Sequence, residues 1–467
     1  MIDFGTGGFR GVIGDTFTRH NVELTASALA LVLREENKAD LSVAVGYDRR
    51  FMSETAAVWF AERLRAAGIN VLLSDRATPT PAVMYTVWSR GLYGGVMFTA
   101  SHNPYYFNGI KLFTDGGVDA DVAFTAKVEE KARLIEGSSA PEAARGEFVR
   151  EDFLEGYLAF VGSFLSDRLQ DSGVKIFYDA LYGVGAESIN ALAQRYRFRN
   201  FTLAHGTRDA FFGFSLPNPT ESVMRGIYEK NAGGAYDFMM ATDSDADRLG
   251  IVDEKGNVVG SNDILGALYY YLHKYRGMRG AAVKNCATSL LLDKLAEKFG
   301  EKCYEVDVGF KNISRKMLET DALIGGESSG GLTVRGYIHG KDSVFSSMLF
   351  TEMAVVMGKP VSEIVREVHE FAGYSLFAEE RTVEVRSLAD VKEFLGKSDP
   401  AITEPVRRAA AFGRNYKYEL ENGWALLRMS GTEPVLRIFA ETESESKTRR
   451  ILNELEGFLK NLHNSVV

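Results

Sequence analysis

Strand-like and helix-like segments alternate along most of this chain, and that rhythm constrains the fold more than any other feature. Residues 41–47 (LSVAVGY) form an apolar run of strand length. Ser53 can cap a following helix, in which apolar side chains recur at helical spacing until Gly68. Further apolar runs at 70–73 and 94–98 complete a βαβ pattern. Such a pattern predicts a parallel sheet covered by helices.

The same rhythm restarts twice, which divides the chain into domains. One restart lies at 174–180 (VKIFYDA) and the other near residue 259. Near the C-terminus the pattern changes to strand-like segments joined by short polar turns, followed by one helix, which predicts an antiparallel sheet. We therefore predict three α/β domains and one α+β domain, at residues 1–147, 148–255, 256–372 and 373–467.

The composition narrows the classes of partner. The 467 residues carry 54 Lys and Arg against 63 Asp and Glu, a formal net charge of −9, which argues against nucleic acids and anionic membranes as partners. No apolar run reaches about 18 residues, so we expect no membrane-spanning helix. Two cysteines and the lack of an apolar leader favour a cytoplasmic location. The sequence leaves the oligomeric state open.

The segment 242–248 (TDSDADR) carries the strongest chemical signal. It follows an apolar strand-like run, so Asp243, Asp245 and Asp247 would share one face at the carboxyl end of a strand if the chain stays extended. A like-charge pair about 4 Å apart costs about 4 kcal/mol at an effective dielectric of about 20, so three such carboxylates need water, protons or a shared cation. Oxygen ligands of this kind favour Mg²⁺.

Two alternatives to a magnesium site remain open for this segment. The first is a solvated acidic turn. The second is a calcium loop of the EF-hand type, in which Glu254 would fit position 12. Arg248 argues against the second alternative because it occupies position 6, where that loop needs glycine.

A second signal is the segment 99–104 (TASHNP), which also follows an apolar strand-like run. Ser101 lies next to His102 and ten residues before Lys111, an arrangement that suits a nucleophile. The G-x-S-x-G elbow of acyl-transfer enzymes is missing, which favours a phosphoryl group on the serine. The alternative is an ordinary polar turn.

Three further loops combine glycine with polar side chains. In 325–331 (GGESSGG), an acid and hydroxyls between glycines suit a sugar, the alternative being a flexible hairpin loop. In 428–434 (RMSGTEP), followed by Arg437, an arginine and hydroxyls suit a phosphate, the alternative being a β-turn with exposed charges. The opening loop 4–11 (FGTGGFRG) follows no strand, so it is not a dinucleotide fingerprint, but it carries Arg10.

In this order the loops closely resemble those of the α-D-phosphohexomutase superfamily, which includes phosphoglucomutases and phosphomannomutases. The resemblance covers the full length. FGTGGFRG resembles the opening loop, TASHNP with NGIK the phosphoserine loop, TDSDADR the metal loop, GGESSGG the sugar loop and RMSGTEP the phosphate loop. The segments VGYDRR (45–50), TPTPAV (78–83) and VGFKNI (308–313) fit as well.

The resemblance implies a fold and an activity. Three related α/β domains with mixed sheets and a C-terminal α+β domain would surround a central cleft. The activity would be a phosphohexomutase that interconverts sugar 1-phosphate and 6-phosphate through a phosphoserine enzyme and a bisphosphate, with Mg²⁺ as cofactor.

The resemblance also assigns roles residue by residue. The catalytic residues would be Ser101, Lys111, His102, Arg10 and Arg248, with Lys111 the first choice for general acid/base and His102 the second. Mg²⁺ would be held by a phosphate oxygen on Ser101 and by Asp243, Asp245 and Asp247. The sugar phosphate would be bound by Glu327, Ser329, Gly309, Lys311, Arg428, Ser430, Gly431, Thr432 and Arg437.

Departures from the family's pattern leave the sugar open. Gly331 stands where many phosphomannomutase-type members have His, Tyr105 where many have Pro, Tyr182 where many have His, and Ser343 ends a stretch that often reads KDG. VGFK resembles phosphoglucomutase or phosphopentomutase types rather than glucosamine mutases, and glucose phosphates are the leading substrate. The alternatives are a phosphomannomutase or phosphopentomutase, a sugar-bisphosphate synthase or phosphatase, and a non-catalytic sugar-phosphate sensor.

Overall fold

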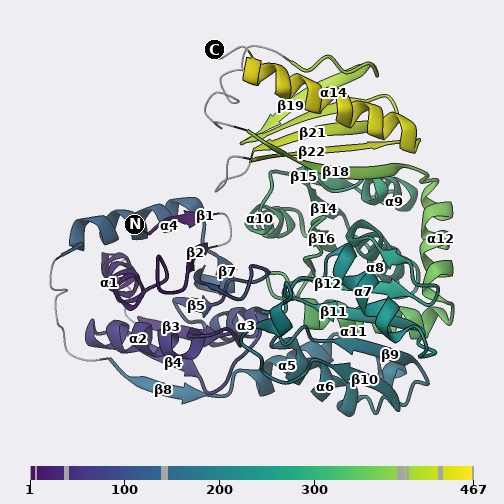
Figure 1. The fold of residues 1–467 in the computed structure, drawn as a ribbon. Coiled ribbons are helices and arrows are strands. Elements are labelled where there is room, and N and C mark those ends of the chain that lie inside the picture. Colours follow the sequence, from purple (N-terminus) through teal and green to yellow (C-terminus); the bar gives the residue numbers. More distant parts are fainter. Residues whose placement is uncertain are drawn as a thin grey trace.

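The computed structural model describes residues 2–5, 8–35, 41–137, 146–385, 395, 399–429 and 435–464, and for 461–464 the backbone alone. Its described strands form four sheets, each built from a successive part of the chain (Figure 1). We call each sheet with its helices a domain and number the domains in chain order. In Figure 1 the first domain lies to the left of the second and third, and the fourth lies above the third.

The first domain has an eight-stranded sheet. Its strands are β1 (Phe4–Gly5), β2 (Gly8–Val12), β3 (Ser42–Tyr47), β4 (Asn70–Ser74), β5 (Gly94–Phe98), β6 (Phe107–Thr114), β7 (Val118–Asp119) and β8 (Phe148–Glu151). Its helices are α1 (Arg19–Glu35), α2 (Ser53–Ala66), α3 (Thr80–Arg90), α4 (Val122–Ile135) and the 3₁₀ turn η1 (Asp115–Gly117). The order is β1-β2-β6-β5-β3-β4-β8, with β7 beside β6; β3 pairs in parallel with β4 and β5, whereas β6 runs antiparallel to β5.

The apolar runs predicted as strands form the centre of this sheet. β3 is buried at every position, and α2 covers the sheet with Phe60 and Leu64 in the core. Ser53 begins α2 but does not cap it, contrary to our prediction. Its hydroxyl instead donates to Asp48 Oδ1 at 2.7 Å, because a buried carboxylate is the stronger acceptor.

The second domain has a five-stranded sheet in the order β10-β9-β11-β12-β13. The strands are β9 (Lys175–Asp179), β10 (Asn200–Ala204), β11 (Phe238–Thr242), β12 (Leu249–Asp253) and β13 (Val258–Val259). The helices are α5 (Leu154–Ser163), η2 (Asp167–Leu169), α6 (Gly185–Arg195), η3 (Phe212–Phe214) and α7 (Glu221–Asn231). β9, β10 and β11 are parallel, and β12 returns antiparallel to β11.

The third domain has a four-stranded sheet in the order β15-β14-β16-β17. The strands are β14 (Ala282–Asn285), β15 (Cys303–Val306), β16 (Ile324–Gly326) and β17 (Leu332–Val334). The helices are α8 (Ser261–Lys274), α9 (Leu291–Phe299), α10 (Phe310–Thr320), α11 (Ser343–Met357) and α12 (Val361–Ala372). α9 buries Leu291, Leu292 and Leu295 and ends at Gly300, whose φ of 70° closes the helix.

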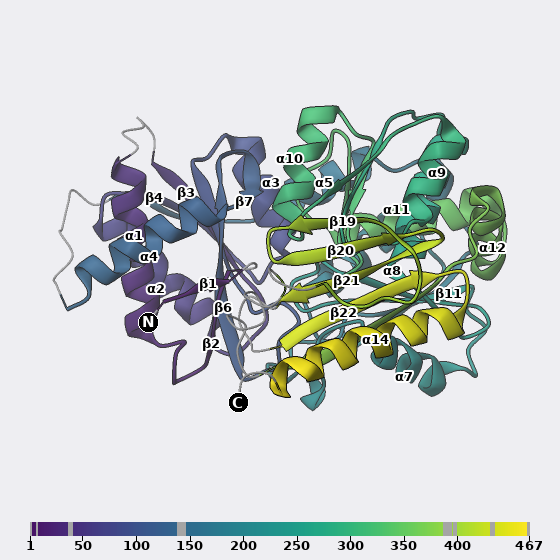
Figure 2. The same cartoon turned by 90° about the horizontal axis from the view of Figure 1, so that it is seen from above.

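The fourth domain has an antiparallel sheet in the order β18-β22-β21-β20-β19. The strands are β18 (Phe377–Glu384), β19 (Val406–Phe412), β20 (Asn415–Leu420), β21 (Gly423–Met429) and β22 (Val435–Thr442), and the helix is α14 (Glu445–Asn464). Figure 2 shows this sheet from above, with α14 lying along β22. The buried side chains of Ile451 and Leu455 attach the helix to the sheet.

Each of the first three sheets ends its parallel part in an antiparallel hairpin, namely β5–β6, β11–β12 and β16–β17. The connecting loops are 99–106, 243–248 and 327–331. The three loops therefore occupy equivalent places in three similar sheets. The predicted fold class, three related α/β domains with mixed sheets and an α+β domain, is confirmed.

The predicted domain boundaries stay predictions, although one pairing bears on the first of them. Strand β8 pairs in parallel with β4, so the first sheet includes residues beyond 147. Within the described ranges, no single helix is both long and apolar enough to span a bilayer; only α11 and α12 together, bent by 85°, meet that measure.

Candidate functional site

The loop after β5 presents Ser101 to the second domain. Ser101 is buried and has a φ of 50°, a left-handed conformation that is uncommon for residues other than glycine. Its backbone N–H donates to Thr99 Oγ1 at 2.8 Å, which stabilises the turn. Its hydroxyl donates to Asp243 Oδ2 at 2.8 Å. The candidate nucleophile thus directly contacts the acidic loop of another domain.

Arg50 supports the Ser101 loop through hydrogen bonds to its backbone. The guanidinium is fully buried and lies 3.3 Å from Asp48 Oδ2. It donates to backbone carbonyls along the loop, those of Ser101, Asn103 (2.7 Å), Pro104 (2.9 Å) and Phe107 (3.1 Å). One side chain therefore sets the path of the loop from Ser101 to Phe107.

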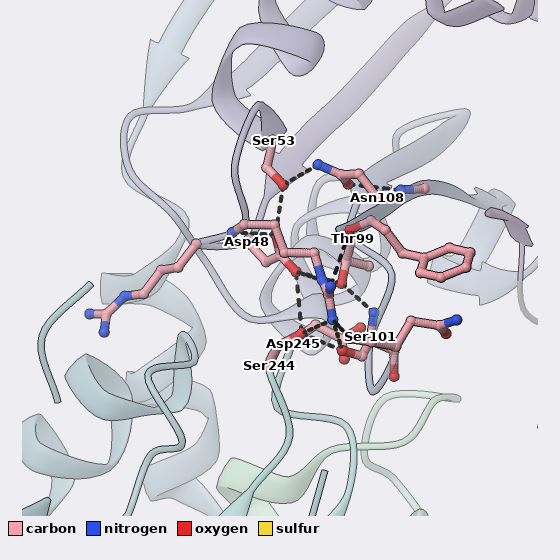
Figure 3. A network of polar contacts seen from close by, with 12 residues as sticks. Asp48, Ser53, Thr99, Ser101, Asn108, Ser244 and Asp245 are labelled. Carbon is pink, nitrogen blue, oxygen red and sulfur yellow. Dashed lines mark hydrogen bonds and ion pairs between the residues drawn. The ribbon is translucent and has the colours of Figure 1, made fainter. Parts of the chain in front are cut away.

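Asp48 in turn holds Arg50 and the acidic loop. It accepts from Ser53 and Thr99 at 2.7 Å each, and from Ser244 Oγ at 3.3 Å. Burial raises the pKa of Asp48, although Arg50 and the hydroxyl donors oppose that shift. Ser244 also donates to the carbonyl of Ser101 at 2.6 Å, so the network shown in Figure 3 joins the first and second domains.

Our prediction required the loop to stay extended. In the structure the loop turns instead, and this turn brings the three aspartates together. Asp243 Oδ1 accepts from the backbone N–H groups of Asp247 (2.9 Å) and Arg248 (3.1 Å), and Ala246 has a φ of 58°. One oxygen from each of Asp243, Asp245 and Asp247 lies within 4.8 Å of the other two, and all three residues are buried.

The donor set fits a divalent cation. Asp245 Oδ1 and Asp247 Oδ1 are buried without a hydrogen-bond partner among the described residues. Orphaned buried oxygens of this kind are costly unless something binds them. Three clustered carboxylates match the oxygen coordination that Mg²⁺ prefers. Burial on this scale is incompatible with the solvated acidic turn, and strand β11 before the loop rules out an EF-hand, in which a helix stands there.

Lysines contact the outer oxygens of the same cluster. Lys111 Nζ lies 2.6 Å from Asp245 Oδ2 and 2.9 Å from Asp247 Oδ2, and Lys341 Nζ lies 3.2 Å from Asp247 Oδ2. Burial opposes the charge on Lys111, but Asp245 and Asp247 outweigh it and raise the pKa of the lysine. Lys111 is therefore protonated in this arrangement.

The carboxylates differ in their ionisation. Burial, then Asp247 and Asp245, raise the pKa of Asp243 well above its usual value. Burial also opposes ionisation of Asp247, but Lys111, Lys341 and Arg248 lower its pKa well below the usual value. A cation beside Asp243 would oppose this shift, because it favours the ionised carboxylate.

The other predicted catalytic residues contact the Ser101 loop or the acidic loop. Arg10 Nη1 donates to Asn103 Oδ1 at 2.7 Å, and Arg248 Nε lies 3.8 Å from Asp247 Oδ1. His102 Nδ1 lies 3.3 Å from Ser101 Oγ. Burial, then Arg248 and Arg10, lower the pKa of His102 to about 2, so the imidazole is neutral and weakly basic.

Glu327 of the third domain joins this cluster through Lys341. Lys341 Nζ lies 3.8 Å from Glu327 Oε1, which also accepts from the exposed Ser329 at 2.7 Å. Asn285 Nδ2 donates to Glu327 Oε2 at 3.3 Å. The predicted sugar loop therefore lies next to the predicted metal loop.

The predicted phosphate loop is described only at its two ends. Arg428 and Arg437 lie directly opposite each other on β21 and β22, while Ser430, Gly431 and Thr432 fall outside the described residues. Burial, then Arg437, lower the pKa of Arg428. Two like charges across a strand pair destabilise a sheet, and a shared anion relieves that repulsion.

Gly309 and Lys311 stand at the start of α10, in the third domain. Gly309 has a φ of 118°, which only glycine adopts readily, and it precedes the first residue of α10. Lys311 lies in the first turn of that helix. The structure thus places both in the third domain at a helix N-terminus, where backbone N–H groups favour anions.

Our sequence reasoning assigned no role to Arg50, Asp48, Thr80 or Lys341. Thr80, at the start of α3, donates its hydroxyl to Asp245 Oδ2 at 2.7 Å, and its backbone N–H donates to Asp245 O at 3.0 Å. The only signal available was that these residues lie in segments that fit the family, namely VGYDRR, TPTPAV and the stretch 339–343.

Comparison with known proteins agrees with the loops and the fold. Four family models match the chain, all described as phosphoglucomutase/phosphomannomutase: α/β/α domain I at residues 1–137, domain II at 155–256, domain III at 260–371 and the C-terminal domain at 381–457.

Relatives span the whole chain. A phosphoglucomutase/phosphomannomutase of Thermococcus kodakarensis is 29% identical, with 96% of each chain covered. A phosphoglucosamine mutase of Nautilia profundicola is 30% identical, with 98% of each chain covered. A solved structure provisionally described as a phosphomannomutase of Thermus thermophilus has a TM-score of 0.84 and 27% identity, covering 98% of this chain and 99% of the other.

The chain therefore belongs to the phosphoglucomutase/phosphomannomutase family. It is an enzyme of the phosphohexomutase type, an isomerase that transfers a phosphoryl group within a sugar phosphate.

Proposed function

We propose that this protein interconverts hexose 1-phosphate and hexose 6-phosphate through a phosphoserine at Ser101. The observation that carries the proposal is the 2.8 Å contact between Ser101 Oγ and Asp243, with Lys111 bound to the neighbouring Asp245 and Asp247. A nucleophilic oxygen, a metal-binding acid cluster and a protonated lysine from two domains meet at one point.

Charge balance supports a phosphoserine at this place. The three aspartates and a phosphoserine bring about five negative charges. Lys111, Lys341 and Arg248, which contact the aspartates, bring three positive charges. A divalent cation leaves the cluster near neutrality. When bound by Asp243, Asp245, Asp247 and a phosphate oxygen, Mg²⁺ would stabilise the negative charge of the transferring group.

The bonds and protons of the transfer can be accounted for with residues of this chain. The bond between phosphorus and Ser101 Oγ breaks as the bond to the free sugar hydroxyl forms. Lys111 gives its proton to Ser101 Oγ and takes up the proton that the sugar hydroxyl loses, so the lysine ends the step protonated, as it began. The bisphosphate then turns over and returns its other phosphoryl group to Ser101 by the reverse step.

Two sites would hold the sugar while it reacts. Glu327 and Ser329 would bond to sugar hydroxyls, since together they accept and donate hydrogen bonds. Arg428 and Arg437 would hold the phosphate that does not react, together with Ser430, Gly431 and Thr432. Gly309 and Lys311 would contribute from the start of α10. Arg437 Nη1 also lies 3.3 Å from Glu380 Oε1, so a phosphate would share this arginine with that carboxylate.

We infer glucose phosphates as the first substrate to test, because VGFK resembles phosphoglucomutase types. Among the relatives, one is named for glucose and mannose and another for glucosamine. The experiment is a kinetic panel of glucose, mannose, glucosamine and pentose 1-phosphates, with products identified by phosphorus NMR. We expect the isomeric monophosphate, with the highest kcat/KM for glucose. Release of inorganic phosphate would instead identify a phosphatase, and accumulation of bisphosphate would identify a synthase.

A further inference from the structure

A strained aromatic turn of the second domain contacts the Ser101 loop. Phe212, Gly213 and Phe214 have φ values of 51°, 59° and 58°, a left-handed run that bulky residues rarely adopt. Asp209 holds the turn by accepting from the backbone N–H groups of Phe211 and Gly213, each at 2.9 Å. Strain of this kind persists only where the surrounding structure imposes it, and it gathers at functional sites.

Of the phenylalanine rings of the strained turn, one is buried and another is exposed. Phe212 is 1% exposed, and its ring centre lies 5.0 Å from the guanidinium carbon of Arg50. Phe214 is 76% exposed, yet its ring lies 5.7 Å from that of Tyr105 in the Ser101 loop. Phe211 lies 5.4 Å from the same tyrosine. The turn therefore contacts the loop both through Arg50 and directly.

The contact between Phe212 and Arg50 does not block the hydrogen bonds that the guanidinium donates. The N–H groups of a guanidinium lie in its plane, whereas an aromatic ring attracts the cation over a face. Arg50 can therefore stack on Phe212 while it donates to the carbonyls of Ser101 and Asn103. In a buried place this attraction is stronger than at the surface.

The position of Phe212 also matters for the geometry between domains. Ser101 belongs to the first domain and Asp243 to the second. Arg50 bonds to Ser101 and lies 3.4 Å from Ser244 Oγ in the second domain. Phe212 provides a second contact between Arg50 and the second domain. Phe212 contacts Arg50, and Arg50 bonds to Ser101, which carries the reacting oxygen.

We propose that Phe212 is a positioning residue for phosphoryl transfer. By stacking on Arg50 it holds the 99–106 loop in the conformation that places Ser101 Oγ beside the acidic cluster. This inference rests on the proposed role of Ser101. It predicts that the electron density of the Phe212 ring, and not only its volume, sets the rate of transfer.

The test replaces Phe212 by phenylalanines carrying one, two and three ring fluorines. Fluorine withdraws electron density from the ring face and weakens its attraction for Arg50, while the shape changes little. We expect kcat for the preferred hexose 1-phosphate to fall stepwise, to about a tenth with three fluorines, with KM changed less than about twofold. Phe212→Tyr keeps an electron-rich ring and should retain most of kcat.

A matched control separates this effect from loss of packing. Phe177 is a buried phenylalanine of the same domain, whose ring packs against Tyr236 at 5.4 Å. Phe177→Leu should lower the melting temperature and leave kcat unchanged.

Two outcomes would overturn the inference. One is a flat kcat across the fluorinated series, and the other is a loss confined to KM. The proposed function is tested separately by Ser101→Ala: if that variant turns over normally, the phosphoserine role fails, whereas an inactive Ser101→Ala with a flat fluorine series rejects the role of Phe212 alone.

Discussion

The hydroxyl of Ser101 donates a hydrogen bond of 2.8 Å to Asp243, although 142 residues separate the two in the sequence. The contact joins equivalent hairpin loops of two similar sheets, β5–β6 and β11–β12. Each loop alone is a polar turn with an uncommon backbone conformation. Together they place a nucleophilic oxygen next to a buried acid cluster, which neither domain could form by itself.

Lys111 and His102 should contribute very differently to catalysis. Lys111→Met should lower kcat by about 10²–10⁴-fold, the usual worth of a general acid or base. His102→Asn should lower kcat less than about tenfold, because burial holds the pKa of His102 at about 2 and the ring does not titrate near neutrality. The measurement is the pH dependence of kcat/KM between pH 5.5 and 7.5. Disappearance of an inflection near pH 6.5 in His102→Asn would reverse the assignment.

Thr80 should set the affinity for the divalent cation without touching it. Its hydroxyl donates to Asp245 Oδ2, and loss of such a partner typically weakens metal binding by about 10–100-fold. Chelation should abolish activity and Mg²⁺ should restore it, with Thr80→Val requiring about that much more Mg²⁺ for half activation. Thr86→Val is the control, because the Thr86 hydroxyl bonds within the same helix, to Ala82 O at 2.9 Å. Equal Mg²⁺ requirements in both variants would contradict the prediction.

Gly331 should control the position of Lys341. A Cβ at residue 331 would lie 2.1 Å from Lys341 Cδ, so Gly331→Ala must displace the lysine from Asp247. We expect Gly331→Ala and Lys341→Ala each to lower kcat/KM by about tenfold or more, and the double variant to lose little beyond either single variant.

The control for that double-mutant cycle is Gly226→Ala. Gly226 lies in α7 with open space around it, so the change should leave kcat intact and at most stabilise the helix. Additive losses in the Gly331 and Lys341 variants would show that the two residues act independently.

Asp342 should make stability fall as pH rises. Burial raises the pKa of Asp342 to about 6, although Tyr337, Tyr157 and backbone N–H groups oppose the shift. The folded state therefore binds more protons than the unfolded state between about pH 4 and 6, and stability is lost as pH rises through that window. A difference of this size is worth about 3 kcal/mol. Between pH 4 and 6 the melting temperature of Asp342→Asn should rise relative to that of the native protein, and above pH 7 the difference should stay constant. A difference that does not depend on pH anywhere would contradict this prediction.

The sequence predicted the central strands well because apolar runs depend on burial alone. β3, β9 and β11 all form where the runs lie. The antiparallel return strands were harder to identify. Strand direction depends on how a polar loop turns, and β6 and β12 carry no pattern that distinguishes them from a parallel strand.

The residue types of the candidate site could be predicted from the sequence, but the geometry of the site could not. Ser101 and the three aspartates were identified because each follows an apolar strand in a recognisable motif. Arg50 and Lys341 acquire their roles from contacts across the fold, such as Arg50 to the Ser101 loop and Lys341 to Asp247. No local spacing encodes such contacts, and the turn that gathers the aspartates depends on hydrogen bonds to Asp243.

The most direct test of the account is the site of phosphoryl transfer. The native protein and Ser101→Ala are each incubated with hexose 1,6-bisphosphate, and the chain is analysed by intact mass and peptide mapping. The account predicts one phosphate per native chain, on the peptide that contains Ser101, and none on Ser101→Ala, which should also lack mutase activity. Phosphate on another residue, or normal turnover by Ser101→Ala, would contradict it.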